Sequence, residues 1–124
     1  MFRRIGILFL LTLSFGFLHS CKNKNPSVAK IFVRSSSNQL VPGAKVIIIG
    51  DVNSNPETKQ DVDTLITNES GFVEFYLTPH FELGGEEYEV AYFDILVKSS
   101  VSGEGSGYIR TRVHTTAVET VYIQ

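Results

Sequence analysis

Residues 88–98 read YEVAYFDILVK and form the longest stretch of the chain in which apolar residues recur at every second position. Ala91, Phe93, Ile95 and Val97 occupy these positions, which is the period of a β-strand with one face in a core. After residue 27, no stretch repeats apolar residues at the spacing of an amphipathic helix. Residues 88–98 therefore predict a long strand and favour an all-β domain.

Shorter stretches of the same kind flank this strand and are separated by residues that favour turns. Val, Ile and Thr supply 29 of the 104 residues after residue 20, whereas Ala occurs four times, a bias that suits strands. We expect residues 78–87 to form a loop and residues 99–107 to form a flexible connection. Further strands are expected at residues 28–34, 44–49, 64–67, 72–77, 108–115 and 117–123. The fold class is thus predicted to be an all-β, seven-stranded antiparallel β-sandwich.

Composition narrows the classes of protein to which this chain could belong. Its 124 residues suffice for one domain, and its single cysteine excludes a disulfide framework and a cysteine-rich zinc site. The formal net charge is −2, and it is −4 without residues 1–20, which carry Arg3 and Arg4 but no acidic residue. This acidic balance argues against nucleic-acid binding.

The N-terminus has the pattern of a secretory signal peptide. Arg3 and Arg4 precede a mainly apolar run of fourteen residues, 5–18. Because a membrane-spanning helix needs roughly 20 residues, the run fits the central region of a signal peptide better than a membrane span. We expect a lipoprotein signal peptide at residues 1–20, before a lipidated tether (21–27) and the β-sandwich domain (28–124).

The single cysteine follows this run directly. Leu18, His19 and Ser20 precede Cys21, and together they resemble a bacterial lipobox. The resemblance implies cleavage before Cys21 and acylation of its thiol and amine, palmitate being one such acyl group. Two or three acyl chains anchor a protein stably. Because Lys22 is not the Asp that retains many lipoproteins in the inner membrane, we expect a Gram-negative outer-membrane protein, facing the periplasm or the cell surface.

Two further segments resemble a family signature. Residues 38–46 read NQLVPGAKV and residues 67–75 read TNESGFVEF. They resemble the P-V-x-G-A-x-V and T-D-x-x-G-x-x-x-F segments of carboxypeptidase-regulatory-like domains, a match that covers residues 28–77. B-type repeats of bacterial collagen-binding surface proteins share this signature. The resemblance implies a transthyretin-like (prealbumin-like) or Ig-like sandwich that acts as a spacer or as a binding module, not as a catalyst.

The candidate catalytic residues are few. After residue 20 the histidines are His80 and His114, and the chain contains neither an HExxH motif nor a glycine-rich phosphate loop. The end of the chain, Tyr122, Ile123 and Gln124, differs from the Tyr-Arg-Gly-Ser-type tail of the hydroxyisourate hydrolases, which have this fold. We therefore expect that the protein is not an enzyme and has no cofactor. A small hydrolase is a remote alternative that would require His80 and His114 to converge.

The polar loop at residues 50–63 offers a candidate calcium site. An EF-hand loop needs Gly at position 6 and Glu at position 12, but this loop has Pro56 and Val62 there. An irregular site is the alternative that stays open, in a calcium-stabilised, adhesin-like module. Its candidate ligands are Asp51, Asn53, Asn55, Asp61 and Asp63.

The last three strands offer the main candidate binding surface. If alternate residues face the core, the outward positions carry tyrosines, cations and a histidine, which are typical of binding surfaces. The candidates are Tyr92, Lys98, Tyr108, Arg110, Arg112, His114 and Tyr122. We expect a lipid-anchored, noncatalytic envelope protein that acts as a structural or binding module for another envelope protein or a glycan, with no nucleic-acid partner.

Overall fold

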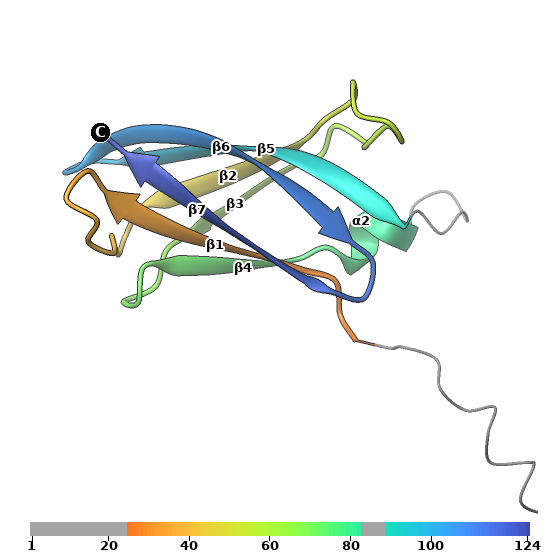
Figure 1. Cartoon of the computed structure of the whole chain (residues 1–124), viewed down its shortest axis with the longest axis horizontal. Helices are drawn as coiled ribbons and strands as arrows, with labels where there is room; N and C mark the ends of the chain where they lie inside the picture. The colour runs from red at the N-terminus through yellow and green to blue at the C-terminus, as the bar shows by residue number, and fades with distance from the viewer. Residues whose placement is uncertain (1–24, 83–88) are drawn as a thin grey trace, which may run out of the picture.

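The computed structural model describes residues 25–82 and 89–124, so the expected signal peptide and Cys21 lie outside the described residues. Seven strands and one short helix form a two-layered sandwich (Figure 1). No helix in the described part is long and apolar enough to cross a membrane. The elements are β1 (Val28–Ser35), β2 (Lys45–Gly50), β3 (Val62–Ile66), β4 (Phe72–Tyr76), α2 (Thr78–Glu82), β5 (Val90–Ser99), β6 (Gly103–Arg112) and β7 (Thr116–Ile123).

The strands form a three-stranded sheet of order β4-β1-β7 and a four-stranded sheet of order β3-β2-β5-β6. The predicted all-β sandwich of seven strands is confirmed. One strand pair differs from the antiparallel expectation, because β1 and β7 run parallel. These are the first and last strands of the domain. No short turn joins them, so their relative direction is set by the packing of the intervening chain and not by a hairpin.

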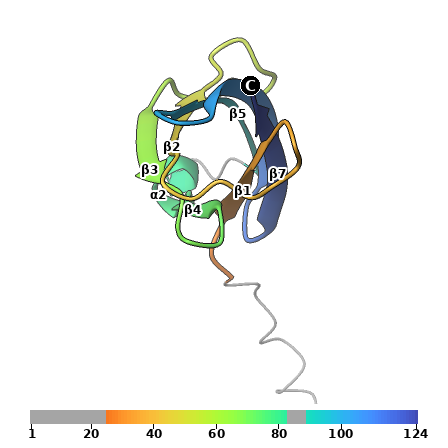
Figure 2. The same ribbon diagram turned by 90° about the vertical axis from the view of Figure 1, so that its left-hand side faces the viewer.

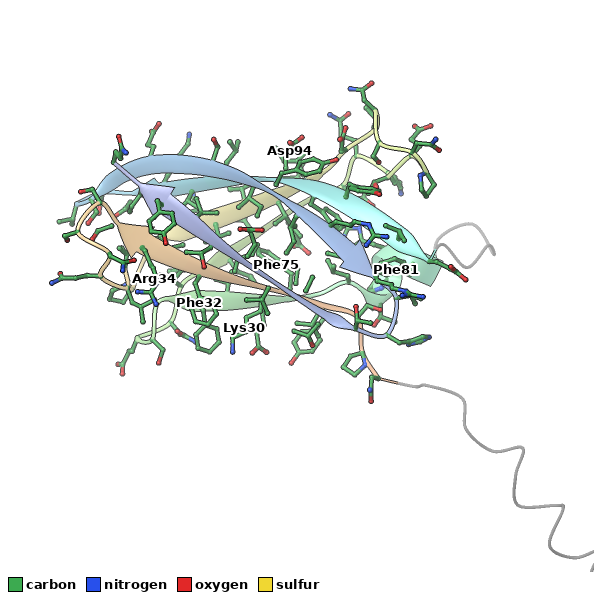
Figure 3. All side chains as sticks on the ribbon, in the orientation of Figure 1. Lys30, Phe32, Arg34, Phe75, Phe81 and Asp94 are labelled. Carbon is green, nitrogen blue, oxygen red and sulfur yellow. The ribbon has the colours of Figure 1, made fainter. Side chains whose placement is uncertain are left out.

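The core lies between the two sheets and follows the period of two. The four alternating residues Ala91, Phe93, Ile95 and Val97 are at most 5% exposed, as their spacing predicts. Phe75 from β4 and Phe81 from α2 fill the space between the layers (Figure 3). The helix α2 lies where a loop was expected, and Phe81, at 2% exposure, is its contribution to the core.

The connection between β5 and β6 is shorter and more regular than expected. Only residues 100–102 make the turn, since β6 begins at Gly103 and pairs with β5 from its first residue. Gly103, Gly105 and Gly107 occupy alternate positions in the first half of β6, and they face β7. A Cβ atom on Gly105 would lie 2.4 Å from the carbonyl oxygen of Tyr122, and one on Gly103 would lie 2.0 Å from that of Gln124. These glycines therefore allow the β6 and β7 backbones to come close together.

This contact closes one side of the sandwich. The backbone groups of Glu104 and Gln124 donate to each other over 3.1 and 3.0 Å, although β6 and β7 belong to different sheets. Viewed from the end, the ribbon is closed on the side of β7, while β3 and β4 lie on the opposite side (Figure 2). The edges of β3 and β4 are thus the open edges of the two layers.

Thr67 joins the first loop of the domain to the end of β3. Its side chain donates a hydrogen bond to the carbonyl oxygen of Val41 over 2.7 Å and accepts one from the amide of Ala44 over 2.9 Å. Thr67 is only 4% exposed, so water cannot readily replace either bond. The residues that carried the family resemblance at 38–46 and 67–75 are therefore linked through one buried hydroxyl.

Replacing Thr67 by valine should lower the free energy of unfolding by about 1–3 kcal/mol, because buried backbone groups lose their partner. The matched control is Thr67→Ser, which keeps the hydroxyl and should cost about 1 kcal/mol or less for the lost methyl group. Urea unfolding measures both changes. Equal losses in the two variants would show that the hydroxyl does not contribute.

Candidate functional site

Four of the seven candidate binding residues lie together on the outer face of β5 and β6. In this antiparallel pair, Tyr92 lies opposite Arg110, Asp94 opposite Tyr108, and Val90 opposite Arg112. Side chains of directly opposed residues lie close enough to interact. Tyr92, Tyr108, Arg110 and Arg112 therefore form one continuous surface, which we call the tyrosine–arginine face. Asp94, on the same outer surface, is labelled in Figure 3.

The two tyrosines of this face are fixed by the loop that follows β2. The hydroxyl of Tyr108 donates a hydrogen bond of 2.6 Å to Oδ2 of Asp51, and the amide of Asp51 donates to the carbonyl oxygen of Tyr92 over 3.0 Å. The rings of Tyr92 and Tyr108 are stacked, with centroids 6.0 Å apart. The amide of Tyr92 also donates to Oγ1 of Thr58, over 2.9 Å. The loop and the two strands thus hold an ordered aromatic surface.

The Asp51 carboxylate changes the chemistry of Tyr108. The hydrogen bond to Asp51, together with burial and the negative charge of Asp51, raises the pKa of Tyr108 from 10.0 to about 12. The neutral phenol is favoured in the folded protein. This hydrogen bond therefore contributes fully to stability below pH 10, and its contribution is lost as the pH rises from about 10 to about 12.

A titration of tyrosine absorbance at 295 nm in the folded protein should contain one step near pH 12. Tyr108→Phe should remove this step, because it removes the group that the Asp51 carboxylate keeps protonated. Tyr122→Phe, which alters another exposed tyrosine, should leave the step in place. A high-pH step that persists in Tyr108→Phe would contradict the assignment.

The other three candidate residues lie away from this face. Lys98 is at the far end of β5, opposite Glu104. His114 lies in the turn between β6 and β7 with a positive φ of 58°, and its Nδ1 is 2.7 Å from the carbonyl oxygen of Asn25. Tyr122 is on β7, in the other sheet, beside Arg34 of β1. Strand pairing thus separates these three residues from the other four candidates, which alternation within single strands could not do.

The acidic residues of the loop at 50–63 are engaged in other contacts. Oδ1 of Asp51 accepts a hydrogen bond from the amide of Asn53 over 2.9 Å, while its Oδ2 accepts that of Tyr108. Asp61 lies 3.7 Å from Nζ of Lys59, and Asp63 lies on β3 opposite Ile48.

Asn55, the remaining candidate calcium ligand, precedes a cis bond to Pro56. No group of three His, Cys, Asp or Glu side chains within residues 25–82 and 89–124 is placed to hold a metal ion.

The two histidines occupy separate environments. The side chain of His80 in α2 is 11% exposed, and its ring lies edge-on to Phe93 with centroids 5.3 Å apart. Its Nδ1 is 3.9 Å from Oδ2 of Asp61, too far for a hydrogen bond. This ring nitrogen has no hydrogen-bond partner among the described residues. At His114, by contrast, the backbone amide donates to the hydroxyl of Ser27, and the ring Nδ1 lies 2.7 Å from the carbonyl oxygen of Asn25, so the two rings share no partner among the described residues.

An aromatic cluster that the sequence did not predict lies on the outer face of the three-stranded sheet. The rings of Phe32 and Phe72 have centroids 5.4 Å apart, and Nζ of Lys30 lies 4.3 Å from the centre of Phe72. Figure 3 shows Lys30 and Phe32 side by side on this face. Alternation along β1 puts Lys30 and Phe32 on the same face of the strand, but only the pairing of β1 with β4 brings Phe72 beside them.

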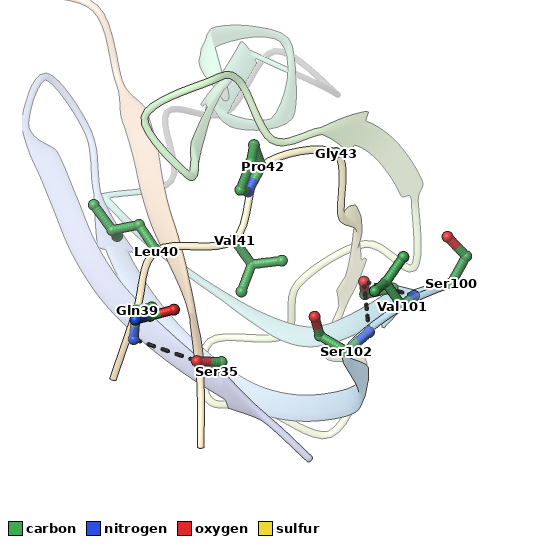
Figure 4. A pocket seen from close by; sticks show the side chains of 10 residues that line it. Ser35, Gln39, Leu40, Val41, Pro42, Gly43, Ser100, Val101 and Ser102 are labelled. Carbon is green, nitrogen blue, oxygen red and sulfur yellow. Dashed lines mark hydrogen bonds between the residues drawn. The ribbon is translucent and has the colours of Figure 1, made fainter. Parts of the chain in front are cut away.

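A second feature that sequence reasoning missed is an open pocket of about 470 Å³ at the end of the sandwich where β5 turns into β6. Its walls come from the loop between β1 and β2 and from the β5–β6 turn (Figure 4). The amides of Gln39 and Ser102 donate to the hydroxyls of Ser35 and Ser99 over 3.3 and 3.2 Å. The lining is uncharged and consists of Ser35, Gln39, Leu40, Val41, Pro42, Gly43, Ser99, Ser100, Val101 and Ser102.

In comparisons with known proteins, no family model matches this chain, and no curated protein matches it. Among solved structures, it is similar to a catechol 1,2-dioxygenase from Acinetobacter sp. ADP1 inhibited by bound mercury, with a TM-score of 0.51 and 11% identity. The match covers 86% of this chain and 54% of the dioxygenase chain, so this chain spans about half the length of that protein.

This likeness overturns the expectation that the chain is not an enzyme. That expectation rested on the absence of catalytic motifs and on the resemblance to a noncatalytic sandwich module, whereas a similar fold occurs within an enzyme. Because one fold supports many functions, the fold gives no ground for excluding catalysis. At 11% identity the likeness shows the fold alone.

Proposed function

We propose that this protein is a lipid-anchored cell-envelope protein whose β-sandwich binds another envelope protein or a glycan through the tyrosine–arginine face. The observation that carries the binding role is the assembly of Tyr92, Tyr108, Arg110 and Arg112 on neighbouring positions of β5 and β6. Tyrosine and arginine provide much of the binding energy at protein interfaces. The Asp51 bond to Tyr108 pre-organises the face, which reduces the entropy lost on binding.

The lipid anchor is proposed from the apolar run at residues 5–18 and the lipobox-like residues before Cys21. From Cys21 to Asn25 the chain can extend over at most about 14 Å. Beyond Asn25 the chain is attached to the domain, since Ser27 and Asn25 both contact His114. A lipid on Cys21 would therefore hold the sandwich close to the membrane surface, in reach of envelope partners.

The anchor is tested by the intact mass of the protein purified from its own membranes. We expect the mass of residues 21–124 plus acyl chains, and recovery in the membrane fraction. Cys21→Ser should appear in the soluble fraction without acyl mass. An unmodified wild-type chain cut at another position would contradict the anchor and would point to a freely secreted domain.

The binding face is tested with a photo-crosslinking tyrosine analogue, benzoylphenylalanine, in place of Tyr92 in living cells. The matched control carries the analogue at Tyr122, an exposed tyrosine of the opposite sheet. We expect a discrete adduct at position 92 that is weaker in Arg110→Ala and absent at position 122. A protein partner gives an adduct of defined mass, and a glycan gives one that glycan-degrading enzymes remove. Equal yields at both positions would contradict a binding role for this face.

A further inference from the structure

Strand β3 is an open edge of the four-stranded sheet, and its backbone has groups available for another strand. Within residues 25–82 and 89–124, it pairs with β2 alone. The amide of Thr67 donates to Ala44 and the carbonyl oxygen of Asp61 accepts from Gly50, so odd-numbered residues direct their backbone groups toward β2. Because these directions alternate along a strand, the backbone N–H and C=O groups of Val62, Thr64 and Ile66 point toward the open edge.

The side chains of β3 leave much of this edge accessible. Every residue of the strand is exposed, and Val62 and Ile66 are 62% and 65% exposed. Natural edge strands are usually shielded by charged side chains, proline, a bulge or a covering loop. The sequence of β3, VDTLI, contains one charged residue, Asp63, and no proline, and the strand pairs with β2 without a bulge. A regular edge with exposed apolar residues at both ends fits a second strand.

We propose that two copies of this chain pair antiparallel through β3, with Thr64 of one copy opposite Thr64 of the other. In this register Val62 lies opposite Ile66 of the second copy, and Ile66 lies opposite its Val62. Each of the three residues whose backbone groups point to the open edge thus lies opposite another such residue. Each pair exchanges two hydrogen bonds. Six hydrogen bonds therefore join the four-stranded sheets of the two copies into one eight-stranded sheet.

The side chains of β3 are self-complementary in this register. Two exposed apolar pairs form between Val62 and Ile66, which lie on the same face. Asp63 lies opposite Leu65 of the second copy, so the two aspartates do not face each other directly. No two like charges lie directly opposite each other in this register, so the strand can pair with an identical copy.

The geometry of this pair allows both copies to be anchored in the same membrane, and here the inference rests on the proposed lipid anchor. The two-fold axis of an antiparallel edge pair is perpendicular to the joined sheet. In each copy the chain enters at β1, which belongs to the three-stranded sheet (Figure 1), so the two entry points lie on the same side of the joined sheet. A five-residue edge is short compared with standard interfaces. We therefore expect pairing in the membrane, where anchoring concentrates the copies.

The test is disulfide cross-linking of the full-length Thr64→Cys variant in its own membranes. In the proposed register the two Cα atoms at position 64 are about 5.5 Å apart, within the range of a disulfide. The matched control is Val62→Cys, on the same strand and face, whose counterpart in the second copy is roughly 13 Å away along the strand. We expect a dimer band at least tenfold stronger for Thr64→Cys. Similar bands from both variants would indicate random collisions and overturn the register.

A second pair of variants tests the backbone bonds. Val62→Pro in the Thr64→Cys background removes an N–H that points to the open edge, and leaves the β2–β3 bonds intact because proline is tolerated at the first residue of a strand. We expect it to abolish the dimer band, while Val62→Ala preserves it. A band that survives Val62→Pro, or an adduct of Thr64→Cys with a different protein, would overturn self-pairing. Membrane fractionation of the same samples reports the lipid anchor separately.

Discussion

Replacing Phe93 by alanine should lower the free energy of unfolding by about 3–5 kcal/mol. Phe93 is fully buried on β5, next to the central strand β2 and facing the opposite sheet. Its removal leaves a cavity that the rigid strands cannot close, and it also removes the edge contact with the His80 ring. Because domains of this size are stable by only about 5–15 kcal/mol, this loss is a large fraction of the total stability.

The matched control is Phe32→Ala, which removes the same side chain from the outer face of β1. Phe32 is half-buried and contacts Phe72 and Lys30, so we expect a loss of about 1–2 kcal/mol. Urea unfolding followed by circular dichroism compares the two variants. Equal losses would mean that Phe93 does not lie in the core.

Replacing Gly105 by valine should cost about 1–3 kcal/mol or more, because it inserts a branched side chain where the backbones of β6 and β7 meet. Even a Cβ atom there would lie 2.4 Å from the carbonyl oxygen of Tyr122. A carbonyl oxygen of the backbone cannot rotate away as a side chain can. The strands must separate, and the bonds between Glu104 and Gln124 should be lost with them.

Ser106→Val is the matched control, because the adjacent residue of β6 is exposed on the outer face. A strand favours valine there, so we expect a change within about 0.5 kcal/mol. Hydrogen exchange of the Gln124 amide adds a local measure, since its protection should fall in Gly105→Val alone. Unchanged protection in that variant would show that β6 and β7 do not close the sandwich.

The sequence predicts the strands of this domain well because the side-chain period of a strand is a local property. Ala91, Phe93, Ile95 and Val97 are buried as their alternation requires. Four consecutive apolar residues at 46–49 would indicate burial on both faces, yet Ile47 and Ile49 are only half-buried. The glycines from residue 103 onward predicted a flexible connection, because glycine favours turns far more often than it marks the close approach of two strands.

The candidate binding site was predictable only in part. Alternation correctly placed Tyr92 and Tyr108 on outer faces, but it could not tell that Tyr122 belongs to the opposite sheet. The bond between Tyr108 and Asp51 joins residues 57 positions apart in the sequence. Neither residue carries a local signal for the other, so no pattern in the sequence predicts this pair.

The sequence by itself determined that this protein is an all-β sandwich, and the expected N-terminal signal peptide rests on the sequence alone. Both follow from short patterns: a side-chain period of two in the strands, and two basic residues before an apolar run. The tertiary structure decided which strands are neighbours, that β1 and β7 run parallel, that glycines close one side, and that β3 stays open. The reason is that backbone hydrogen bonds between strands are nearly the same for every residue type, so partners are selected by the packing of the whole domain.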